Sequence, residues 1–550
     1  MNTITIGGKA GHGVKAAAKL SAKIFSDIGY YIFILNDYPS VISGDHNYSK
    51  ITFDKKEIHS YYNDSDFLIA LDERTLKEHK SEIKKDGVVL FDKNSFESNE
   101  KNHFGIPAGN IVKESEGISI MRNTALLGAF MYVAGIDFCV LEKILKKTYP
   151  SNAKINIEIA KKGYLYAKDN FKQKLKTKKI GKPKKFLCGN MSLSDGALNA
   201  GLETYIAYPM TPATSILHYL AGKNNVKTIQ PENEISVITM ALGSSYAGSK
   251  TMIGTSGGGF ALMTESISFA GISEIPLVIV ESQRAGPSTG IPTYTGQSDL
   301  NFTLNPGHGE FPLVVIAPGS PEQAFFNGSE ALQIAWKYQL PVIVLLDKHL
   351  SDSSKTFEID KKRIKKINPK LSKGGKNYLR YKFTKDGISP ITFPGKKDTV
   401  VKVTSYEHLE NGITTENKKD IKKMFDKRFE KIKNFEKEMN NLETFKVYGK
   451  GKNVIVTWGS SLGAVLEAVK EIKDVKVIQP IYLKPFPHKS IKKYLKKAKN
   501  IVCVEGNATA QLADLIKLNT GIEIKNKILK YDSREFEPIE LRKELKRWFK

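Results

Sequence analysis

Short apolar runs alternate with amphipathic stretches along the first 170 residues of the chain. The segment VKAAAKLSAKIFSDIG (14–29) spaces its apolar residues as one face of a helix requires. Residues 114–170 follow the same helical pattern, with a break at TYPSN. Strands are predicted where apolar residues run together, at TITIGG (3–8), DFLIALD (66–72), GVVLFD (87–92) and IVK (111–113). This alternation predicts an α/β domain built on a parallel sheet.

A second block, residues 186–352, repeats the alternation with longer apolar strands that end in Gly, Thr or Ser. Its helices are predicted at EISVITMALGSSYAG (234–248) and PEQAFFNGSEALQIAWKY (321–338). Its strands are predicted at TYIAYP, TMIGTS, PLVIVES, PLVVIAPGS and PVIVLLD. The pattern predicts a doubly wound sheet with ligand-handling loops at the carboxyl ends of its strands.

The remaining segments complete a multidomain α/β chain. A charged linker, FKQKLKTKKIGKPKKF, joins the first two blocks, and the pattern weakens after residue 352. There a Gly/Pro-rich stretch and one highly charged helix predict a connecting segment, and βα alternation returns from residue 451. The predicted domains are 1–180, 186–352, 353–450 and 451–550.

Composition fits an ordinary globular protein, with 41% hydrophobic and 26% charged residues. No apolar run approaches the length of a membrane span, and the N-terminus lacks the pattern of a signal peptide. We therefore expect a cytoplasmic protein without a membrane partner. The net charge of +26 raises the alternative of nucleic-acid binding. The lysines are widely spread and no stretch interleaves them with aromatic residues, so nucleic acid is not favoured.

Three isolated cysteines limit the chemistry of the chain. Cys139, Cys188 and Cys503 lie far apart in the sequence. This spacing excludes a disulfide framework, a cysteine-bound zinc ion and an iron–sulfur cluster held within this chain. We predict no metal site here, so any required cluster must come from another polypeptide.

The loop AYPMTPATS (207–215) is the first candidate site. Pro209 and Pro212 stiffen it, and hydroxyl groups gather where a helix should begin. One interpretation is a helix N-cap formed by these hydroxyls. The other is a rigid loop that presents hydroxyls and backbone N–H groups to a small anion. The hydroxyl residues are Thr211, Thr214 and Ser215.

A carboxylate follows on the predicted helix EISVITMALGSSYAG. Glu234, Ile238, Ala241 and Ser245 share one helical face, which is otherwise small or apolar. Glu234 is either a helix-start residue that interacts with the helix dipole or a buried functional acid. A buried acid of this kind would have a raised pKa and could share a proton with a ligand nitrogen. Glu232 is the alternative acid, because the helix start is uncertain.

Two further loops follow strands of the second block. IGTSGGGFALMTE (253–265) ends a strand in three glycines, which allow a ligand to approach the backbone closely. It lacks the Lys-Ser/Thr of a phosphate-binding loop. In ESQRAGPSTGIPTYTGQSDLNF (281–302), a strand ends in Arg284 and a loop rich in Gly, Pro, Ser and Thr follows. This arginine either binds a carboxylate with two parallel hydrogen bonds or ties the loop to backbone carbonyls.

In their order and spacing, these motifs resemble the α subunit of thiamine-diphosphate-dependent 2-oxoacid:ferredoxin oxidoreductases. YPMTP, the glutamate helix, TSGGGFALM, QRAGPSTG and QSDL follow in family order. GISPITFPG and TSYEHLENG resemble the family's connecting region, and IYLKPFP and VEGNATAQLADLI its transketolase-like C-terminal domain. GGKAGHGV, YPSVISGDHN, DFLIALDE and residues 156–164 resemble the family's γ domain, fused ahead of α. The resemblance covers nearly the whole chain.

The resemblance implies a γ-type α/β domain, a pyrimidine-binding doubly wound domain and a transketolase C-terminal-like domain. It implies oxidative decarboxylation of a 2-oxoacid to acyl-CoA and CO2. Glu234 would bind the aminopyrimidine nitrogen of the cofactor and Thr211 the oxoacid carboxylate, both as catalytic residues. The other cofactor-binding residues would be Tyr208, Pro209, Gly257 and Phe260, and the other substrate-binding residues Arg284, Ser288 and Thr289.

The resemblance also implies partners. The family carries the diphosphate and Mg2+ site and a [4Fe–4S] cluster on a separate β subunit, which passes electrons to ferredoxin. Gly8, Gly11 and Gly13, at a strand-to-helix turn, are candidates for handling coenzyme A. Tyr294 stands where many family members have Lys or Arg, which favours a monocarboxylic oxoacid over 2-oxoglutarate. The alternatives are another thiamine-dependent enzyme, such as an indolepyruvate oxidoreductase, and a non-catalytic scaffold.

Overall fold

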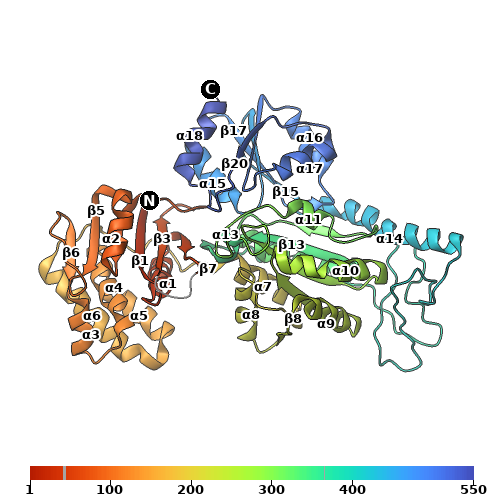
Figure 1. Cartoon of the computed structure of the whole chain (residues 1–550), viewed down its shortest axis with the longest axis horizontal. Helices are drawn as coiled ribbons and strands as arrows, with labels where there is room; N and C mark the ends of the chain where they lie inside the picture. The colour runs from red at the N-terminus through yellow and green to blue at the C-terminus, as the bar shows by residue number, and fades with distance from the viewer. Residues whose placement is uncertain (41–44, 365, 550) are drawn as a thin grey trace. The chain divides into compact units, whose positions relative to one another are not determined.

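The computed structural model describes residues 1–40, 45–364 and 366–549 and divides into two compact units (Figure 1). The first unit contains residues 1–187 together with 353–358 and 537–539. The second contains residues 188–352, 359–536 and the chain from Glu540 onward. The mixed α/β architecture predicted from the sequence is confirmed, whereas the four domain boundaries remain predictions.

The first unit is built on an eight-stranded sheet in the order β6-β5-β4-β1-β3-β2-β14-β7. Strands β1, β4, β5 and β6 run parallel to one another, but β3 is antiparallel to both β1 and β2, and β14 to β2. The prediction of a parallel sheet is therefore wrong where β3 pairs with β1 and β2 and where β14 pairs with β2, because the sequence pattern predicts neither β2 nor β3. The strands are β1 (Asn2–Lys9), β2 (Tyr31–Asp37), β3 (His46–Asp54), β4 (Ser65–Ala70), β5 (Ile83–Asp92), β6 (His103–Ile106), β7 (Lys185–Cys188) and β14 (Ser354–Phe357).

Helices pack on both faces of this sheet, and the helical patterns predicted at 14–29 and within 114–170 are confirmed. The strand predicted at IVK is wrong, because residues 111–113 lie within helix α3, with Ile111 and Val112 buried. A three-residue apolar run cannot distinguish a strand from one face of a helix. Residues 41–44 of the YPSVISGDHN motif lie outside the described residues. The helices are α1 (Val14–Asp27), α2 (Glu73–His79), α3 (Ala108–Glu114), α4 (Arg122–Val133), α5 (Phe138–Thr148) and α6 (Ala153–Asn170).

The second unit contains a seven-stranded sheet in the order β18-β12-β13-β11-β10-β8-β9. All neighbours are parallel except β18, which is an antiparallel edge strand contributed by residues 482–484. The five strands predicted in this block are confirmed. They and their neighbours are β8 (Thr204–Ile206), β9 (Lys227–Ile229), β10 (Thr251–Thr255), β11 (Leu277–Gln283), β12 (Val314–Ile316), β13 (Pro341–Asp347) and β18 (Tyr482–Lys484).

Helices lie on both faces of this sheet, which confirms the doubly wound prediction. Buried side chains of α9 and α10 join one core, which continues into the C-terminal residues 451–550, while α7, α8 and α12 contribute to the core on the other face. The helices are α7 (Gly189–Asn199), α8 (Thr214–Ala221), α9 (Glu234–Tyr246), α10 (Gly257–Ser273), α11 (Leu300–Leu304), α12 (Pro321–Tyr338) and α13 (Lys348–Asp352).

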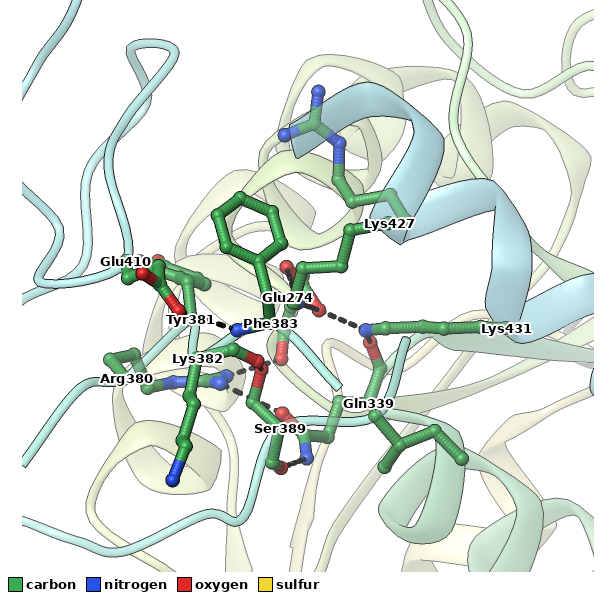
Figure 2. Close-up of polar contacts among 12 residues, drawn as sticks. Glu274, Gln339, Arg380, Tyr381, Lys382, Phe383, Ser389, Glu410, Lys427 and Lys431 are labelled. Carbon is green, nitrogen blue, oxygen red and sulfur yellow. Dashed lines mark hydrogen bonds and ion pairs between the residues drawn. The ribbon is translucent and has the colours of Figure 1, made fainter. Parts of the chain in front are cut away.

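The predicted charged helix is α14 (Lys418–Glu438), and it packs through charged residues (Figure 2). Lys427 and Lys431 are both buried and both pair with the buried carboxylate of Glu274, Lys427 Nζ at 2.7 Å from its Oε1. Arg380, from the irregular segment before the helix, donates to the Glu274 backbone carbonyl at 2.6 Å. Burial acts to raise the pKa of the Glu274 carboxyl, but the two ammonium groups hold it well below its usual range. These contacts fix the connecting segment to the end of α10.

The C-terminal part of the second unit is a separate five-stranded sheet in the order β15-β17-β16-β19-β20. The apolar run VKVIQPIYLKPFP (475–487) is divided between this sheet (β17) and the larger one (β18). The elements are β15 (Phe445–Gly449), β16 (Asn453–Thr457), β17 (Val475–Pro480), β19 (Asn500–Glu505), β20 (Asn526–Leu529), α15 (Ser461–Ala468), α16 (His488–Leu495), α17 (Gln511–Thr520) and α18 (Pro538–Trp548).

Candidate active site

The proline loop follows β8 and leads into α8, as the sequence predicts. However, α8 begins at Thr214 after Ala213, and no side chain in the described part of the chain caps it. The N-cap interpretation of the loop hydroxyls is therefore wrong. Asn190 of α7 holds the loop instead, donating through Nδ2 to Pro212 O at 3.0 Å and to Ser215 Oγ at 2.8 Å. Tyr208 is 38% exposed, and Thr211 is half-buried.

Glu234 is the first residue of α9, and its side chain is only 4% exposed. The predicted face of this helix is confirmed, since Ile238, Ala241 and Ser245 are buried with it. The Oε1 atom of Glu234 has no hydrogen-bond partner among the described residues. Glu232, the alternative acid, is exposed and hydrogen-bonds with the Ser236 hydroxyl. The geometry therefore favours Glu234 over Glu232 as the functional acid.

The glycines at the start of α10 make room for acidic side chains. A Cβ atom added to Gly259 would lie 2.7 Å from Glu234 Oε1 and 2.1 Å from Thr255 Oγ1. One added to Gly257 would lie 2.6 Å from Asp299 Oδ2. Contacts this short do not occur between real side chains, so only glycine lets the helix start approach these carboxylates. The buried oxygen of Glu234 thus lies against the glycine turn, in the space that a side chain at Gly259 would need.

Arg284 follows the carboxyl end of β11 and joins two of the predicted motifs. Its Nη1 donates to the backbone oxygen of Thr211 at 2.9 Å, and the residue is 9% exposed. This bond to a backbone carbonyl is one of the two roles that the sequence analysis allowed for Arg284. Its predicted carboxylate binding remains a prediction, and the tie brings the guanidinium next to the proline loop where that binding is expected.

The other predicted residues differ in their accessibility. Ser288 and Thr289 lie in an exposed part of the loop, and Ser288 has a positive φ of 56°. Phe260 is fully buried in the core and packs edge-on against Phe302, with ring centroids 5.1 Å apart. Ser288 and Thr289 are free to meet a ligand, whereas the Phe260 side chain serves packing.

Sequence reasoning missed Glu281, near the end of β11. Its side chain is 0% exposed, and neither carboxyl oxygen has a hydrogen-bond partner among the described residues. Burial, and then the carboxylates of Asp299 and Asp347, raise the pKa of Glu281 well above its usual value. In the parallel pair of β10 and β11, Glu281 is the register partner of Thr255. An acid directly after the apolar run PLVIV is the signal that could have identified it.

The glycine turn of the first unit borders a separate cavity. Gly11 and Gly13 have positive φ values of 97° and 75°, which other residues rarely adopt. Gly11 lines a cavity of about 320 Å3, together with Lys15 and Tyr38. A Cβ added to Gly8 would lie 2.9 Å from the Leu71 side chain. Only Gly11 of these three glycines therefore has open space beside it, whereas packing against Leu71 requires a glycine at position 8.

The described residues contain neither a metal-binding cluster nor a membrane-spanning helix. They contain no group of three or more His, Cys, Asp or Glu side chains arranged to hold a metal ion. Among the same residues, no helix combines the length and apolar character needed to cross a bilayer.

Family models match three segments of the chain. The model described as "Pyruvate flavodoxin/ferredoxin oxidoreductase, thiamine diP-bdg" matches residues 195–427. "Pyruvate ferredoxin/flavodoxin oxidoreductase" matches residues 3–166, and "Pyruvate:ferredoxin oxidoreductase core domain II" matches residues 451–540. The segment with the proline loop, Glu234 and Arg284 is therefore the one that matches a thiamine-diphosphate-binding domain.

Known proteins are also similar to this chain over nearly its whole length. The 2-oxoacid:ferredoxin oxidoreductase subunit alpha of a Sulfolobus species is 30% identical, over 98% of this chain and 96% of its own. The subunit of the same name from Saccharolobus solfataricus is 31% identical with the same coverage. Among solved structures, 2-oxoglutarate:ferredoxin oxidoreductase from Magnetococcus marinus, with 2-oxoglutarate, coenzyme A and succinyl-CoA bound, aligns with a TM-score of 0.89. The alignment is 29% identical and covers 100% of this chain and 99% of that one.

Proposed function

Because the chain belongs to the 2-oxoacid:ferredoxin oxidoreductase family, as an α subunit, we propose that it forms the pyrimidine side of a thiamine diphosphate site. The reaction is the oxidative decarboxylation of a 2-oxoacid to an acyl-CoA and CO2. The observation that carries the proposal is the buried Glu234 Oε1, which lacks a partner among the described residues and lies against the glycine turn.

The residues of this site fit an aminopyrimidine ring. A buried carboxyl oxygen without a partner is costly unless a ligand or water completes it, and a protonated ring nitrogen would do so. Gly258, between Gly257 and Gly259, has no atom within 4 Å of the position a Cβ would take, so the helix start is open there to a planar ring. When bound, the cofactor supplies a carbon nucleophile and an electron sink for decarboxylation. Glu234 holds the proton at the ring nitrogen, and burial keeps water from competing for it.

Substrate binding is assigned to the proline loop and the loop after β11. Thr211 offers a hydroxyl and Arg284 a guanidinium to the oxoacid carboxylate. The hydrogen bond from Arg284 to Thr211 O holds the guanidinium against the backbone of the proline loop that carries the Thr211 hydroxyl. Ser288 and Thr289 add hydroxyls from the exposed part of the second loop.

The oxoacid is proposed to be monocarboxylic, because Tyr294 replaces a basic residue common in the family. One observation favours 2-oxoglutarate as a second candidate. The guanidinium carbon of Arg534 lies 3.7 Å from the centre of the Tyr294 ring, so a cation stands beside this position. The Magnetococcus marinus protein, similar over its whole length, has 2-oxoglutarate bound. Pyruvate and 2-oxoglutarate should therefore be compared directly.

Partners complete the enzyme. We assign the diphosphate and Mg2+ site and the [4Fe–4S] cluster to a β subunit, with ferredoxin as electron acceptor. The three cysteines of this chain are far apart in sequence and cannot supply a cluster. Coenzyme A is the proposed acyl acceptor, and Gly11, at the open cavity of the first unit, is the glycine of the predicted trio best placed to meet it.

The test is to isolate the tagged chain with its bound partners and to measure oxoacid-dependent reduction of a viologen dye. We expect the complex to be active only with coenzyme A, and the separated chain to be inactive. Activity from the separated chain would contradict the division between subunits. An intact complex that is inactive with every 2-oxoacid would contradict the proposed function.

A further inference from the structure

The QSDL motif, residues 297–300, follows the exposed loop after β11 and runs into α11, and the proposed function gives it no role. Its first residue, Gln297, is 2% exposed and carries an amide that can make four hydrogen bonds. Both amide atoms and both backbone groups are used. Such a completely satisfied buried amide is typical of a residue that fixes one arrangement of its neighbours.

Most of these bonds reach the C-terminal residues 451–550. Gln297 Oε1 accepts from Gly506 N at 2.8 Å and from Ser461 Oγ at 3.0 Å, and its Nε2 donates to Trp458 O at 3.2 Å. The Gln297 backbone N–H donates to Gly506 O at 2.8 Å, and its carbonyl accepts from Asn507 Nδ2 at 3.1 Å. Hydrogen bonds from several loops of the C-terminal domain therefore hold this one residue in place.

The same motif touches the strand ends and the helix start of the candidate site. Gln297 Nε2 also donates to Asp347 Oδ2, at the end of β13, at 3.0 Å. Two residues later, Asp299 N donates to Gln283 Oε1, at the end of β11, at 3.0 Å. The carboxylate of Asp299 occupies the space that a side chain at Gly257 would need. The motif thus joins the C-terminal domain to β11, β13 and the start of α10.

Residues 284–296, here called the substrate loop, are fixed at both ends. At the first end Arg284 bonds Thr211 O, and at the far end Gln297 is held by the C-terminal domain. The exposed residues Ser288 and Thr289 lie between these two anchors. Thr295 also holds this end of the loop, by accepting from His349 N at 3.3 Å, so releasing the anchor at Gln297 loosens the far end of the loop without removing any group assigned to the substrate.

We propose that Gln297 is a positioning residue through which the C-terminal domain sets the conformation of the substrate loop. The role rests on the proposed function, because it assumes that this loop meets the oxoacid. Gln297 contacts neither substrate nor cofactor in this scheme. It acts by fixing the far end of the loop, and small displacements of a binding group are costly to catalysis.

A pair of glutamines that also joins the larger sheet's helices to the C-terminal domain provides a matched control. Gln323 of α12 and Gln479 of β17 exchange two hydrogen bonds of 2.8 Å, and both residues are buried. Among the described residues, none of their hydrogen bonds reaches the substrate loop or α10. Gln479→Ala should therefore weaken the association of the two parts without releasing the loop.

The experiment compares Gln297→Ala with Gln479→Ala by two measurements. In the isolated chain, amide hydrogen exchange of residues 284–296 should rise about tenfold or more in Gln297→Ala only. In the complex with its partners, KM for the oxoacid should rise about tenfold in Gln297→Ala, with a smaller change in kcat, and remain near wild type in Gln479→Ala. If Gln297→Ala does not fold, Ser461→Ala, which removes one of its bonds, should give a smaller version of the same changes.

The two failures can be distinguished. Equal loop exchange and equal KM in the two glutamine variants, with similar losses of melting temperature, would overturn the proposal and make Gln297 an ordinary interdomain contact. A wild-type complex without oxoacid activity would instead contradict the proposed function, and the exchange measurement on the isolated chain would still decide whether Gln297 fixes the loop.

Discussion

Glu274 and Glu281 lie within the same helix–strand unit, and both carboxyl groups are buried, but their surroundings are opposite. Glu274 pairs with Lys427 and Lys431, and Arg380 bonds its carbonyl (Figure 2). Glu281 has no hydrogen-bond partner among the described residues and faces two other carboxylates. Glu234, at the start of α9, is likewise left with an unpartnered oxygen there. Paired buried charges hold a segment in place, whereas unpartnered ones indicate a place where something else binds.

This contrast predicts that substitutions at the two kinds of carboxylate affect different properties. Neutralising a paired glutamate should reduce stability and leave the chemistry of folded molecules intact. Neutralising an unpartnered one should preserve or raise stability and, at Glu234, remove activity.

The largest effect is expected at Glu234. Glu234→Gln should reduce the activity of the complex by orders of magnitude, about 3 to 5 kcal/mol of transition-state stabilisation, because an amide cannot hold the ring-nitrogen proton. The melting temperature should stay the same or rise. Steady-state kinetics and thermal unfolding measure the two properties. Glu232→Gln is the control, and a comparable loss of activity there would move the role to the exposed residue.

Glu274→Gln should have the opposite effect, lowering stability and leaving activity unchanged. Removing the carboxylate leaves Lys427 and Lys431 buried without their anion, which should cost about 3 to 5 kcal/mol of unfolding free energy. Denaturant unfolding measures the loss, and kcat per folded complex should not change. Asp426→Asn breaks an exposed pair with Lys422 on the same helix and should cost less than about 0.5 kcal/mol. Equal losses in the two variants would contradict a stabilising role for the buried cluster.

The cluster also predicts a pH dependence. Because the folded-state pKa of Glu274 lies below its unfolded value, its contribution to stability is complete above the unfolded pKa of about 4.5 and is lost as pH falls toward the folded value. The difference in unfolding free energy between wild type and Glu274→Gln should therefore narrow on acidification from about pH 6. A difference that stays constant down to about pH 3 would contradict the ion pairing.

A smaller effect of opposite sign is expected at Glu281. Its folded-state pKa is raised, so its ionisation opposes folding increasingly as pH rises above the unfolded value. Glu281→Gln removes this cost and should raise the unfolding free energy at pH 8 by about 1 to 3 kcal/mol, with the gain disappearing near pH 4. Unfolding at the two pH values measures it. A loss of stability at pH 8 would show that the carboxyl has a partner that stabilises its ionised form.

The smallest effect is expected at Arg284. Arg284→Lys keeps the charge but loses the planar guanidinium, so KM for the oxoacid should rise by about tenfold while the melting temperature changes little. Initial-rate measurements over a range of oxoacid concentrations provide the value. An unchanged KM with a lowered melting temperature would make Arg284 a structural residue that only ties the Thr211 loop.

Local patterns predicted much of this fold. The helix α12 has the bounds that its sequence pattern predicts, and the five apolar strands of the larger sheet are present. The antiparallel pair β2 and β3, and the passage of residues 475–484 from one sheet to the other, depend on pairing between distant segments. A local pattern carries no information about such pairing, and IVK is too short for its pattern to distinguish a strand from a helix.

In the candidate site too, local sequence patterns predicted some features, whereas contacts between distant segments could not be predicted. Glu234 was identified because a carboxylate on an apolar helical face is unusual, and the bond between Arg284 and Thr211 connects two motifs found separately. The bonds of Gln297 to residues 458–507 and the burial of Lys427 beside Glu274 could not be predicted, since these partners lie more than 150 residues away in the sequence. The hydroxyls of the proline loop were consistent with an N-cap, but Asn190 bonds Ser215 from another helix.

The central claim is that Glu234 controls the protonation of the cofactor, and proton exchange at the cofactor's thiazolium carbon tests it most directly. The complex, reconstituted with thiamine diphosphate, is mixed with deuterated water, and loss of the proton at that carbon is followed over time in wild type, Glu234→Gln and Glu232→Gln. We predict that exchange slows by at least about a hundredfold in Glu234→Gln and stays near wild type in Glu232→Gln. Rapid exchange in Glu234→Gln would contradict the assignment of this buried glutamate to the cofactor.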